Sequence, residues 1–372
     1  MNTPTKARYI MIGGFLGAGK KTALARLAQH LTSRGLRVGL ITNDQGSELV
    51  DTAMLRARGF TTEEIPGGCF CCRFNSLMEA SRRLTAATRP DVFIAEPVGS
   101  CTDLVATVTY PLRRIYGHDF SIAPVSVLLD PVRARRVLGL EEGGKFSSKV
   151  LYIYRKQLEE ADIIVINKID LLDDSQLNSL REALAAEFPR AEIMELSARE
   201  SLNLENWFEQ ITGAEQQARS PMEIDYDVYA EGESLLGWLN CTAQLSASEP
   251  FGAGDVLSAI SARIQQRLQS HEAEIAHLKM TLSPDQAIGG AIAAMSLVRN
   301  DFVPELSLEL EDPMQRGQLI INLRAEAAPE LLREIVTESL RALPGAEAKL
   351  EHIEAFRPGR PTPTHRFTSA LG

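Results

Sequence analysis

A glycine-rich turn near the start of the chain constrains its fold more than any other feature. Gly14-Phe15-Leu16-Gly17-Ala18-Gly19-Lys20 follows a short apolar segment, residues 8–13, and leads into residues 20–34, where leucine and alanine recur at helical spacing. Strand, glycine loop and helix in this order are the context that the phosphate-loop motif requires. Its backbone N–H groups and the helix N-terminus favour phosphate oxygens, and Lys20 reaches the β- and γ-phosphates. The predicted phosphate-binding residues are Gly14, Gly17, Ala18, Gly19 and Lys20.

The residue after Lys20 departs from the motif. The motif has Ser or Thr there, whose hydroxyl binds Mg²⁺, whereas this chain has Lys21. Thr22 is a poor substitute, since one step along a helix turns a side chain by about 100° and raises it by about 1.5 Å. We expect Lys21 and Thr22 to lie at the nucleotide, and two alternatives stay open. Either the Lys21 ammonium replaces part of the charge of Mg²⁺, or Lys21 points to solvent and the metal relies on Asp44 and water.

Short apolar segments alternate with amphipathic ones over the first two hundred residues. We expect strands at residues 38–42, 92–95, 125–129, 163–166 and 193–196, and helices that include 77–88 and 176–187. This alternation predicts an α/β fold, the doubly wound and mainly parallel sheet of a P-loop NTPase.

Two acids follow predicted strands, where side chains of parallel sheets face the ligand crevice. Asp44 follows the second strand and Glu96 the third. Both suit Mg²⁺ coordination and positioning of the attacking water, so Lys20, Asp44 and Glu96 form the predicted catalytic set.

Asn167-Lys168-Ile169-Asp170 follows a buried strand and is expected to read a guanine base. The Asp170 carboxylate can accept hydrogen bonds from the N1–H and 2-amino groups of guanine, and adenine lacks this donor pair. Lys168 lies along the base, Asn167 braces the loop, and the turn at Ser197 suits a backbone contact to guanine O6. The predicted ligands are therefore GTP and Mg²⁺.

Three cysteines crowd into Cys69-Phe70-Cys71-Cys72 behind two glycines. Thiolates at this spacing can converge on Zn²⁺ or a similar cation, while neighbouring Cys71 and Cys72 are poor disulfide partners. Cys101, five residues after Glu96, is expected to be a small buried residue.

The pattern of predicted secondary structure changes near residue 215. A polar run at 212–222 predicts a linker, so we expect a GTP-binding domain at 1–215, a smaller α+β domain at 216–355 and an extended tail at 356–372. In the second domain we expect strands at 226–229, 235–243, 275–282, 291–298 and 319–323, and helices at 253–268 and 329–343.

The net charge is −10 and 44% of residues are hydrophobic. Nucleic-acid binding calls for a basic footprint, so we expect no nucleic-acid partner. No apolar run reaches the 18 or more residues of a membrane span, and we expect a cytoplasmic protein with reduced thiols.

These motifs together resemble the CobW/HypB/UreG family of P-loop GTPases, and within it the CobW-like branch. The resemblance rests on the phosphate loop, on Gly68-Cys69-Phe70-Cys71-Cys72, on Glu96 followed by Gly99, and on Asn167–Asp170, and it covers about residues 8–212. It implies GTP-driven handling of zinc or cobalt, with Cys69, Cys71 and Cys72 as metal ligands, and Cys71 and Cys72 the principal ones. It also implies a client metalloprotein or cobalamin-dependent enzyme as partner. A homodimer stays open.

The chain departs from the family pattern at Lys21, at Asn43-Asp44-Gln45-Gly46 and at Glu96-Pro97-Val98-Gly99-Ser100. Three functions therefore compete. The first is a GTP-hydrolysing metallochaperone, and the second is a GTP-gated assembly module with little hydrolysis because of Lys21. The third is a small-molecule kinase, which leaves the guanine-type loop and the thiols unexplained.

Overall fold

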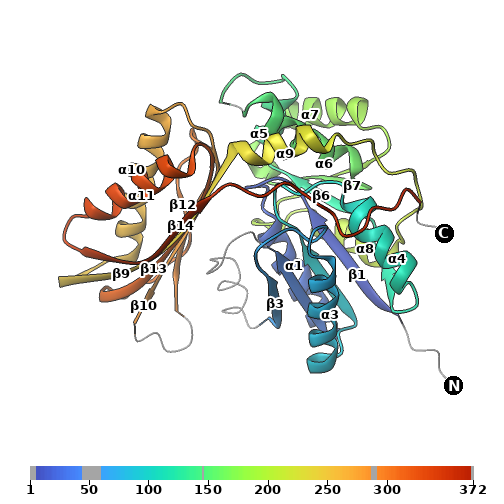
Figure 1. Cartoon of the computed structure of the whole chain (residues 1–372), viewed down its shortest axis with the longest axis horizontal. Helices are drawn as coiled ribbons and strands as arrows, with labels where there is room; N and C mark the ends of the chain where they lie inside the picture. Colours follow the sequence, from blue (N-terminus) through green and yellow to red (C-terminus); the bar gives the residue numbers. More distant parts are fainter. Residues whose placement is uncertain (1–5, 44–59, 145, 286–290, 370–372) are drawn as a thin grey trace. The chain divides into compact units, whose positions relative to one another are not determined.

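The computed structural model describes residues 6–43, 60–144, 146–285 and 291–369 of the chain. These residues form two compact units (Figure 1). The first holds the residues described up to 230 together with 361–369, and the second holds residues 231–360. Each unit is described by itself below.

The first unit is built on a parallel sheet. Its eight strands among the described residues are β1 (Ala7–Gly13), β2 (Val38–Asn43), β3 (Thr62–Ile65), β4 (Val92–Glu96), β5 (Phe120–Ile122), β6 (Ser126–Leu129), β7 (Ile163–Ile166) and β8 (Glu192–Glu195). The order is β3-β2-β4-β1-β6-β7-β8, with β5 paired to β1, and every pair is parallel. Strands β4 and β7 are buried along their whole length, as strands covered on both faces must be. The predicted doubly wound α/β fold is confirmed.

Helices connect these strands. They are α1 (Lys20–Ser33), α3 (Phe74–Thr88), α4 (Tyr110–Tyr116), α5 (Pro131–Val137), α6 (Ser148–Glu160), α7 (Asp174–Glu187), α8 (Leu204–Gly213) and α9 (Tyr226–Leu235), with a π-helix at Val105–Thr109 and a 3₁₀ turn at Ile169–Leu171. Their starts follow local chemistry. Asp173 and Gln176 form a capping box on α7, and Asp130 caps α5 ahead of a first-turn proline.

One predicted strand is wrong, because residues 226–229 begin helix α9. The Asp225 Oδ1 oxygen accepts hydrogen bonds from the N–H groups of Asp227 at 2.8 Å and Val228 at 3.2 Å. This cap satisfies first-turn donors that a strand would have to pair with a neighbour.

The second unit is an antiparallel sheet with two helices. Its strands are β9 (Leu236–Phe251), β10 (Ile275–Pro284), β11 (Ala293–Leu297), β12 (Glu305–Leu308), β13 (Met314–Glu326) and β14 (Glu347–Phe356), in the order β12-β11-β10-β13-β9-β14. Helices α10 (Ala253–Ser270) and α11 (Pro329–Arg341) lie side by side on the sheet (Figure 1). Their apolar residues form one core with it, including Leu257, Ile260, Leu332 and Ile335. A second α+β region is thus confirmed, although the sequence predicted neither β12 nor β14.

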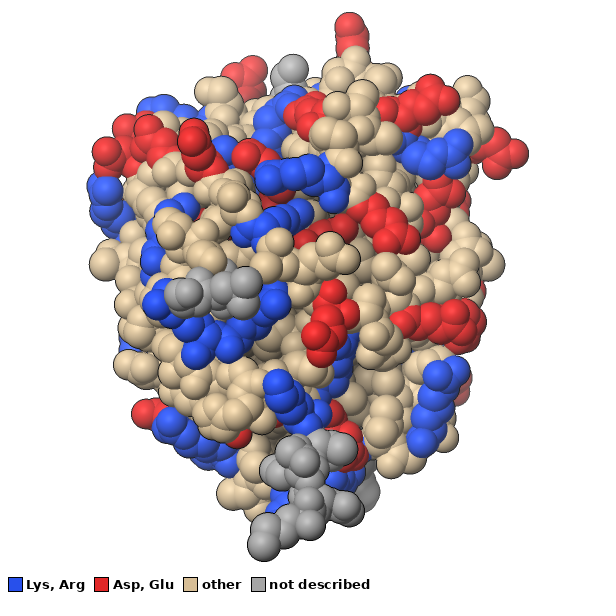
Figure 2. All heavy atoms as spheres, turned by 90° about the vertical axis from the view of Figure 1, so that its right-hand side faces the viewer, with Lys and Arg blue, Asp and Glu red and all other residues tan. Residues whose placement is uncertain are grey.

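The surface carries mixed charge. On the face drawn in Figure 2, basic and acidic side chains are interspersed, and neither sign fills the face. In the described parts of the chain, no helix has the length and apolar character needed to cross a membrane.

Candidate nucleotide and metal site

The phosphate loop lies between β1 and α1, as predicted. Gly14, Gly17 and Gly19 have φ angles of 127°, 82° and 87°, a region that other residues adopt only under strain. A Cβ atom on Gly14 would lie 2.1 Å from the carbonyl oxygen of Leu128 on β6. The loop therefore packs directly against the sheet, and glycine is required both for its conformation and for this close approach.

Lys20 begins helix α1 and is almost fully buried. Its ammonium donates hydrogen bonds to the carbonyl oxygens of Gly14 at 2.8 Å and Phe15 at 3.3 Å. The same nitrogen lies 3.9 Å from Oε1 of Glu96. Lys20 is thus held against the loop that would surround the phosphates, with its charge balanced by the acid at the end of β4.

Lys21 does not point freely into solvent, because its ammonium lies 2.8 Å from Oε2 of Glu96. The side chains of Lys21 and Glu96 are 19% and 8% exposed. The contact is ionic rather than a directed hydrogen bond, since this buried oxygen accepts no hydrogen bond of acceptable geometry from the described residues. A basic side chain therefore neutralises the acid that was predicted to serve Mg²⁺. Thr22 is exposed on the next position of the helix.

The Asn167–Asp170 loop is bound to the phosphate loop. The Asn167 amide nitrogen donates to the carbonyl of Ala18 at 2.8 Å, and its Oδ1 oxygen accepts from the N–H of Ala198 at 3.0 Å. The Lys168 ammonium donates to the carbonyl of Gly17 at 2.8 Å. Two segments about 150 residues apart in sequence therefore form one rigid ligand-facing edge.

The two remaining base-site residues differ in accessibility. Asp170 is exposed and forms no hydrogen bond or ion pair with another described residue, so its carboxylate is available to a base. Ser197 is buried, and its backbone N–H donates to Leu202 at 3.1 Å. The turn at Ser197 thus supports the loop through the bond between Ala198 and Asn167, and its contact with guanine O6 stays a prediction.

Sequence reasoning missed Asp130. This residue follows β6, is 2% exposed, and accepts a hydrogen bond from the Lys168 ammonium at 2.8 Å. It also accepts from the N–H of Arg133 at 3.0 Å as the cap of α5. Its position after a central parallel strand was the available signal, because this is where ligand-facing side chains occur. Asp44, the other predicted acid, lies outside the described residues.

The three thiols of Cys69, Cys71 and Cys72 form a compact cluster just before α3. The Sγ–Sγ distances are 3.0 Å for Cys69–Cys71, 3.1 Å for Cys69–Cys72 and 3.7 Å for Cys71–Cys72. Among the described residues, this is the one group of three or more His, Cys, Asp or Glu side chains whose ligand atoms all gather within 4.8 Å. The predicted metal-binding thiols are thus brought together.

The backbone around these thiols is fixed from both sides. Asn43, the last residue of β2, donates from its amide nitrogen to the carbonyls of Ile65 at 2.8 Å and Gly68 at 2.6 Å. The N–H groups of Cys72 and Arg73 both donate to the carbonyl of Cys69, which closes a tight turn. The sheet edge and the helix start therefore hold the sulfur atoms close together.

Hydrogen bonds among the thiols separate their acidities. The pKa of Cys69 lies well below its ordinary value because the thiols of Cys101, Cys71 and Cys72 hydrogen bond to its sulfur. The hydrogen bond to Cys69 raises the pKa of Cys71, and raises that of Cys72 to about 11. The cluster thus makes Cys69 the most acidic of the three thiols, and a cation that binds here would replace the protons of Cys71 and Cys72.

Residues 361–369 return to the first unit and lie along the cysteine turn. The N–H of Thr362 donates to the Sγ of Cys72 at 3.2 Å, and the N–H of Thr364 donates to the carbonyl of Cys71 at 2.8 Å. The Arg366 guanidinium pairs with the buried carboxylate of Asp103 at 2.8 Å. The predicted extended tail is therefore surface-bound over these residues.

Two histidines, His118 and His365, lie in the first unit and outside the cysteine turn. His365 packs edge-on against Phe74, with ring centroids 5.1 Å apart. His118 is exposed and lies 3.3 Å from Asp119. Neither joins the thiol group described above.

The residues present fit both implied ions. Three sulfur atoms just before α3 suit zinc, and the lowered pKa of Cys69 favours the thiolate that binds a metal ion. The Oε2 atom of Glu96, which accepts no hydrogen bond from the described residues, suits a magnesium ion or its bound water in competition with Lys21.

Several known proteins are similar to this chain in sequence. A zinc chaperone CobW from Sinorhizobium sp is 31% identical over 205 residues, covering 50% of this chain and 57% of that protein. The zinc chaperone YeiR of Escherichia coli K12 is 32% identical over 166 residues, covering 44% of this chain and 47% of that protein. The chain thus spans about half the length of the curated relatives it matches. The solved Zn(II)-bound YjiA GTPase from E. coli is 13% identical, covers 90% of this chain and 99% of that chain, and superposes with a TM-score of 0.40.

The family description "CobW/HypB/UreG, nucleotide-binding domain" matches residues 8–195, which is half of the 372-residue chain. This range contains the phosphate loop, the cysteine turn and the guanine-type loop. The chain belongs to the CobW/HypB/UreG family.

Proposed function

We propose that this protein is a GTP-dependent metallochaperone that couples GTP binding and hydrolysis to the delivery of zinc. The observation that carries the proposal is the position of three converging thiols in the same compact unit as a phosphate loop and a guanine-type loop. The names of the zinc chaperone relatives support zinc as the cargo. Cobalt delivery or assembly of a cobalamin-dependent enzyme is the alternative within the same mechanism.

Different residues would bind the nucleotide, the Mg²⁺ ion and the cargo metal. Lys20 and the loop N–H groups would hold the phosphates, and Asp170 would select guanine. Glu96, and Asp44 outside the described residues, would serve Mg²⁺ and the attacking water. When bound, Mg²⁺ would neutralise charge that develops on the phosphates. Cys69, Cys71 and Cys72 would carry the cargo metal.

The test is a titration of GTP into metal-free and into zinc-loaded protein, both in Mg²⁺ and a non-thiol reductant. By linkage, zinc must change GTP affinity by the same factor by which GTP changes zinc affinity. A severalfold difference in GTP affinity supports the proposal. Equal affinities would mean that the two sites act independently, and the coupling would be rejected.

A second function has one observation in its favour, the ionic contact between Lys21 and Glu96. If Lys21 keeps Glu96 from serving Mg²⁺, the protein is a GTP-gated assembly module with little hydrolysis. Release of inorganic phosphate in a single-turnover experiment separates the two functions. Rapid release supports the GTPase, whereas tight GTP binding without release supports the gated module.

A further inference from the structure

The segment between β4 and the π-helix, residues Glu96–Cys101, touches both halves of the proposed machinery. It starts at Glu96, which contacts Lys20 and Lys21. At Gly99 it packs on the phosphate loop so closely that a Cβ atom there would lie 2.7 Å from Cδ2 and 3.1 Å from the backbone nitrogen of Leu16. It ends at Cys101, whose side chain reaches the cysteine cluster.

Cys101 is buried, with 2% of its surface exposed, and its thiol hydrogen bonds to the thiol of Cys69. A cysteine that only filled space in the core would be surrounded by apolar side chains. This one instead meets the sulfur atom that already contacts Cys71 and Cys72.

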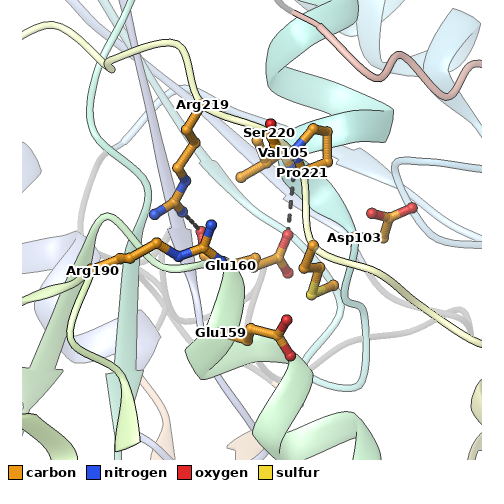
Figure 3. A pocket seen from close by; sticks show the side chains of 9 residues that line it. Asp103, Val105, Glu159, Glu160, Arg190, Arg219, Ser220 and Pro221 are labelled. Carbon is orange, nitrogen blue, oxygen red and sulfur yellow. Dashed lines mark hydrogen bonds between the residues drawn. The ribbon is translucent and has the colours of Figure 1, made fainter. Parts of the chain in front are cut away.

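The backbone of Cys101 is held from one helix, α6. The side-chain amide of Gln157 donates to the carbonyls of Gly99 at 2.9 Å and Cys101 at 2.8 Å. One turn further along, the carboxylate of Glu160 accepts from the Thr102 hydroxyl and from the N–H of Val105, both at 3.1 Å. Figure 3 shows Glu160 reaching toward Val105. The main chain on either side of Cys101 is therefore held by side chains of α6.

We propose that Cys101 is the fourth thiolate ligand of the metal site, completing a four-sulfur site with Cys69, Cys71 and Cys72. This inference rests on the proposed metal-handling function and extends it to a residue outside the cysteine turn. A closed zinc site takes four ligands in a tetrahedron with Zn–S distances of about 2.3 Å, which separates the sulfur atoms by about 3.8 Å. The three sulfur atoms of the turn are at 3.0–3.7 Å and would spread slightly around the ion.

A rotation of its side chain would bring Cys101 into that geometry. Its sulfur borders the cluster on the Cys69 side and stands outside the group of three whose ligand atoms lie within 4.8 Å of one another. A change to another staggered χ1 rotamer moves a cysteine sulfur by about 3 Å without moving the backbone. We infer that such a side-chain movement places the Cys101 sulfur at the fourth corner of the tetrahedron.

The same connection explains how nucleotide and metal would communicate. A shift of the Glu96–Cys101 segment when GTP binds would move the Cys101 sulfur toward or away from the ion, because Gly99 packs on the phosphate loop. The ion would then have four thiolates in one state and three in the other. A site that loses one ligand can release its metal to another protein.

X-ray absorption of the zinc-loaded wild-type protein tests the ligand set directly, without any variant. The expected first shell is four sulfur atoms at about 2.3 Å. Three sulfur atoms with one oxygen or nitrogen in both the nucleotide-free and the GTP-bound protein would overturn the inference. If the wild-type protein binds no zinc at all, the proposed function itself fails, so the two failures are distinguishable.

Variants then assign the fourth sulfur. Cys101→Ser keeps the size of the side chain and removes the thiolate, and the matched control is Cys241→Ser, at a buried cysteine in β9 of the second unit. We expect Cys101→Ser to weaken zinc binding by about tenfold to a hundredfold in competition with a chromophoric chelator. It should also lower the sulfur-to-metal charge-transfer absorption of the Co²⁺-loaded protein by the contribution of one of the four thiolates. The control should match the wild type in both measurements.

Unfolding of the metal-free variants by denaturant checks that they are folded. If Cys101→Ser is folded and its Co²⁺ spectrum and zinc affinity equal those of the control, Cys101 is not a ligand. The severalfold effect of zinc on GTP affinity, measured in each variant relative to its own metal-free protein, should also shrink in Cys101→Ser. An undiminished effect would reject the role of Cys101 in coupling the two sites.

Discussion

Replacing Lys21 by threonine separates the two proposed functions. The substitution removes the ammonium that lies 2.8 Å from Glu96 and restores the hydroxyl that the phosphate-loop motif uses for Mg²⁺. Lys21→Met is the matched control, because it also removes the charge and keeps a long side chain, but adds no oxygen ligand. Any difference between the two variants is therefore due to the hydroxyl.

The structure sets the cost of losing the ion pair. With side chains 19% and 8% exposed, the pair lies between a surface salt bridge and a buried one. Exposed pairs contribute about 0–1 kcal/mol, while breaking a buried pair costs about 3–5 kcal/mol. Lys20 remains 3.9 Å from Glu96 and still compensates its charge. We therefore expect both variants to lower the free energy of unfolding of the metal-free protein by about 1–2 kcal/mol.

The nucleotide assays should then separate the variants. In Lys21→Thr, Mg²⁺ gains a hydroxyl ligand and no longer competes with Lys21 for Glu96, so adding Mg²⁺ should tighten GTP binding by about tenfold or more. Wild type and Lys21→Met should respond clearly less. Phosphate release at saturating GTP should likewise be fastest in Lys21→Thr.

The measurements are GTP titrations with Mg²⁺ or with a chelator, followed by single-turnover phosphate release. If wild-type protein and Lys21→Thr hydrolyse GTP at the same rate with the same Mg²⁺ dependence, Lys21 does not impair the metal. The gated-module function would then lose its main support.

Four further perturbations test other parts of the structure. Burial raises the pKa of Glu160 from 4.5 to about 8, so the folded protein keeps a proton that the unfolded chain releases in this range. The free energy of unfolding should therefore fall as pH rises from about 4.5 to 8, by up to about 1.4 kcal/mol per pH unit. In denaturant unfolding measured at several pH values, the free energy of unfolding of Glu160→Gln should depend less on pH than that of the wild type. The pKa values of Cys71 and Cys72 are raised, so both thiols must lose a proton when zinc binds. The apparent zinc affinity should therefore rise by about tenfold per pH unit for each proton released, as measured by chelator competition between pH 6 and 8. A zinc affinity that does not change with pH would contradict this protonation state. Asn167→Ala removes the hydrogen-bond partner of the Ala18 carbonyl and of the Ala198 N–H, and should lower the free energy of unfolding in denaturant by about 2–4 kcal/mol. A change near zero would mean that this side chain does not hold the two loops together. Asp170→Asn should weaken GTP binding and favour xanthosine triphosphate, whose C2 oxygen can accept a hydrogen bond from the new amide. Thermal stability should not change, because Asp170 is exposed. If the preference between these two nucleotides is unaltered, Asp170 does not recognise the base.

Local sequence determined the elements that create the nucleotide site. The glycines of the phosphate loop are identifiable because the φ angles and the close approach to Leu128 leave few other residues possible. Apolar segments such as residues 163–166 predict buried parallel strands for the same local reason. The α/β fold, the phosphate loop and the converging thiols of the cysteine turn could all be predicted in this way.

Contacts between distant segments could not be predicted from the sequence. The pairing of Lys168 with Asp130 and that of Lys21 with Glu96 depend on which strands lie next to one another and on which rotamers the packing allows. Residues 226–229 show the limit at short range, since their alternation suggests a strand while the Asp225 cap favours a helix.

Cys101 shows most clearly which contacts the sequence determines and which only the tertiary structure decides. The sequence by itself determined that three thiols lie together in one turn, because residues two and three apart in a tight turn must be neighbours. That a fourth thiol meets them was decided only by the tertiary structure, which sets β4 beside β2 and holds the segment after β4 from α6. Sequence separation carries no information about such a contact, because the path of the backbone between the two segments is determined by packing of the whole sheet.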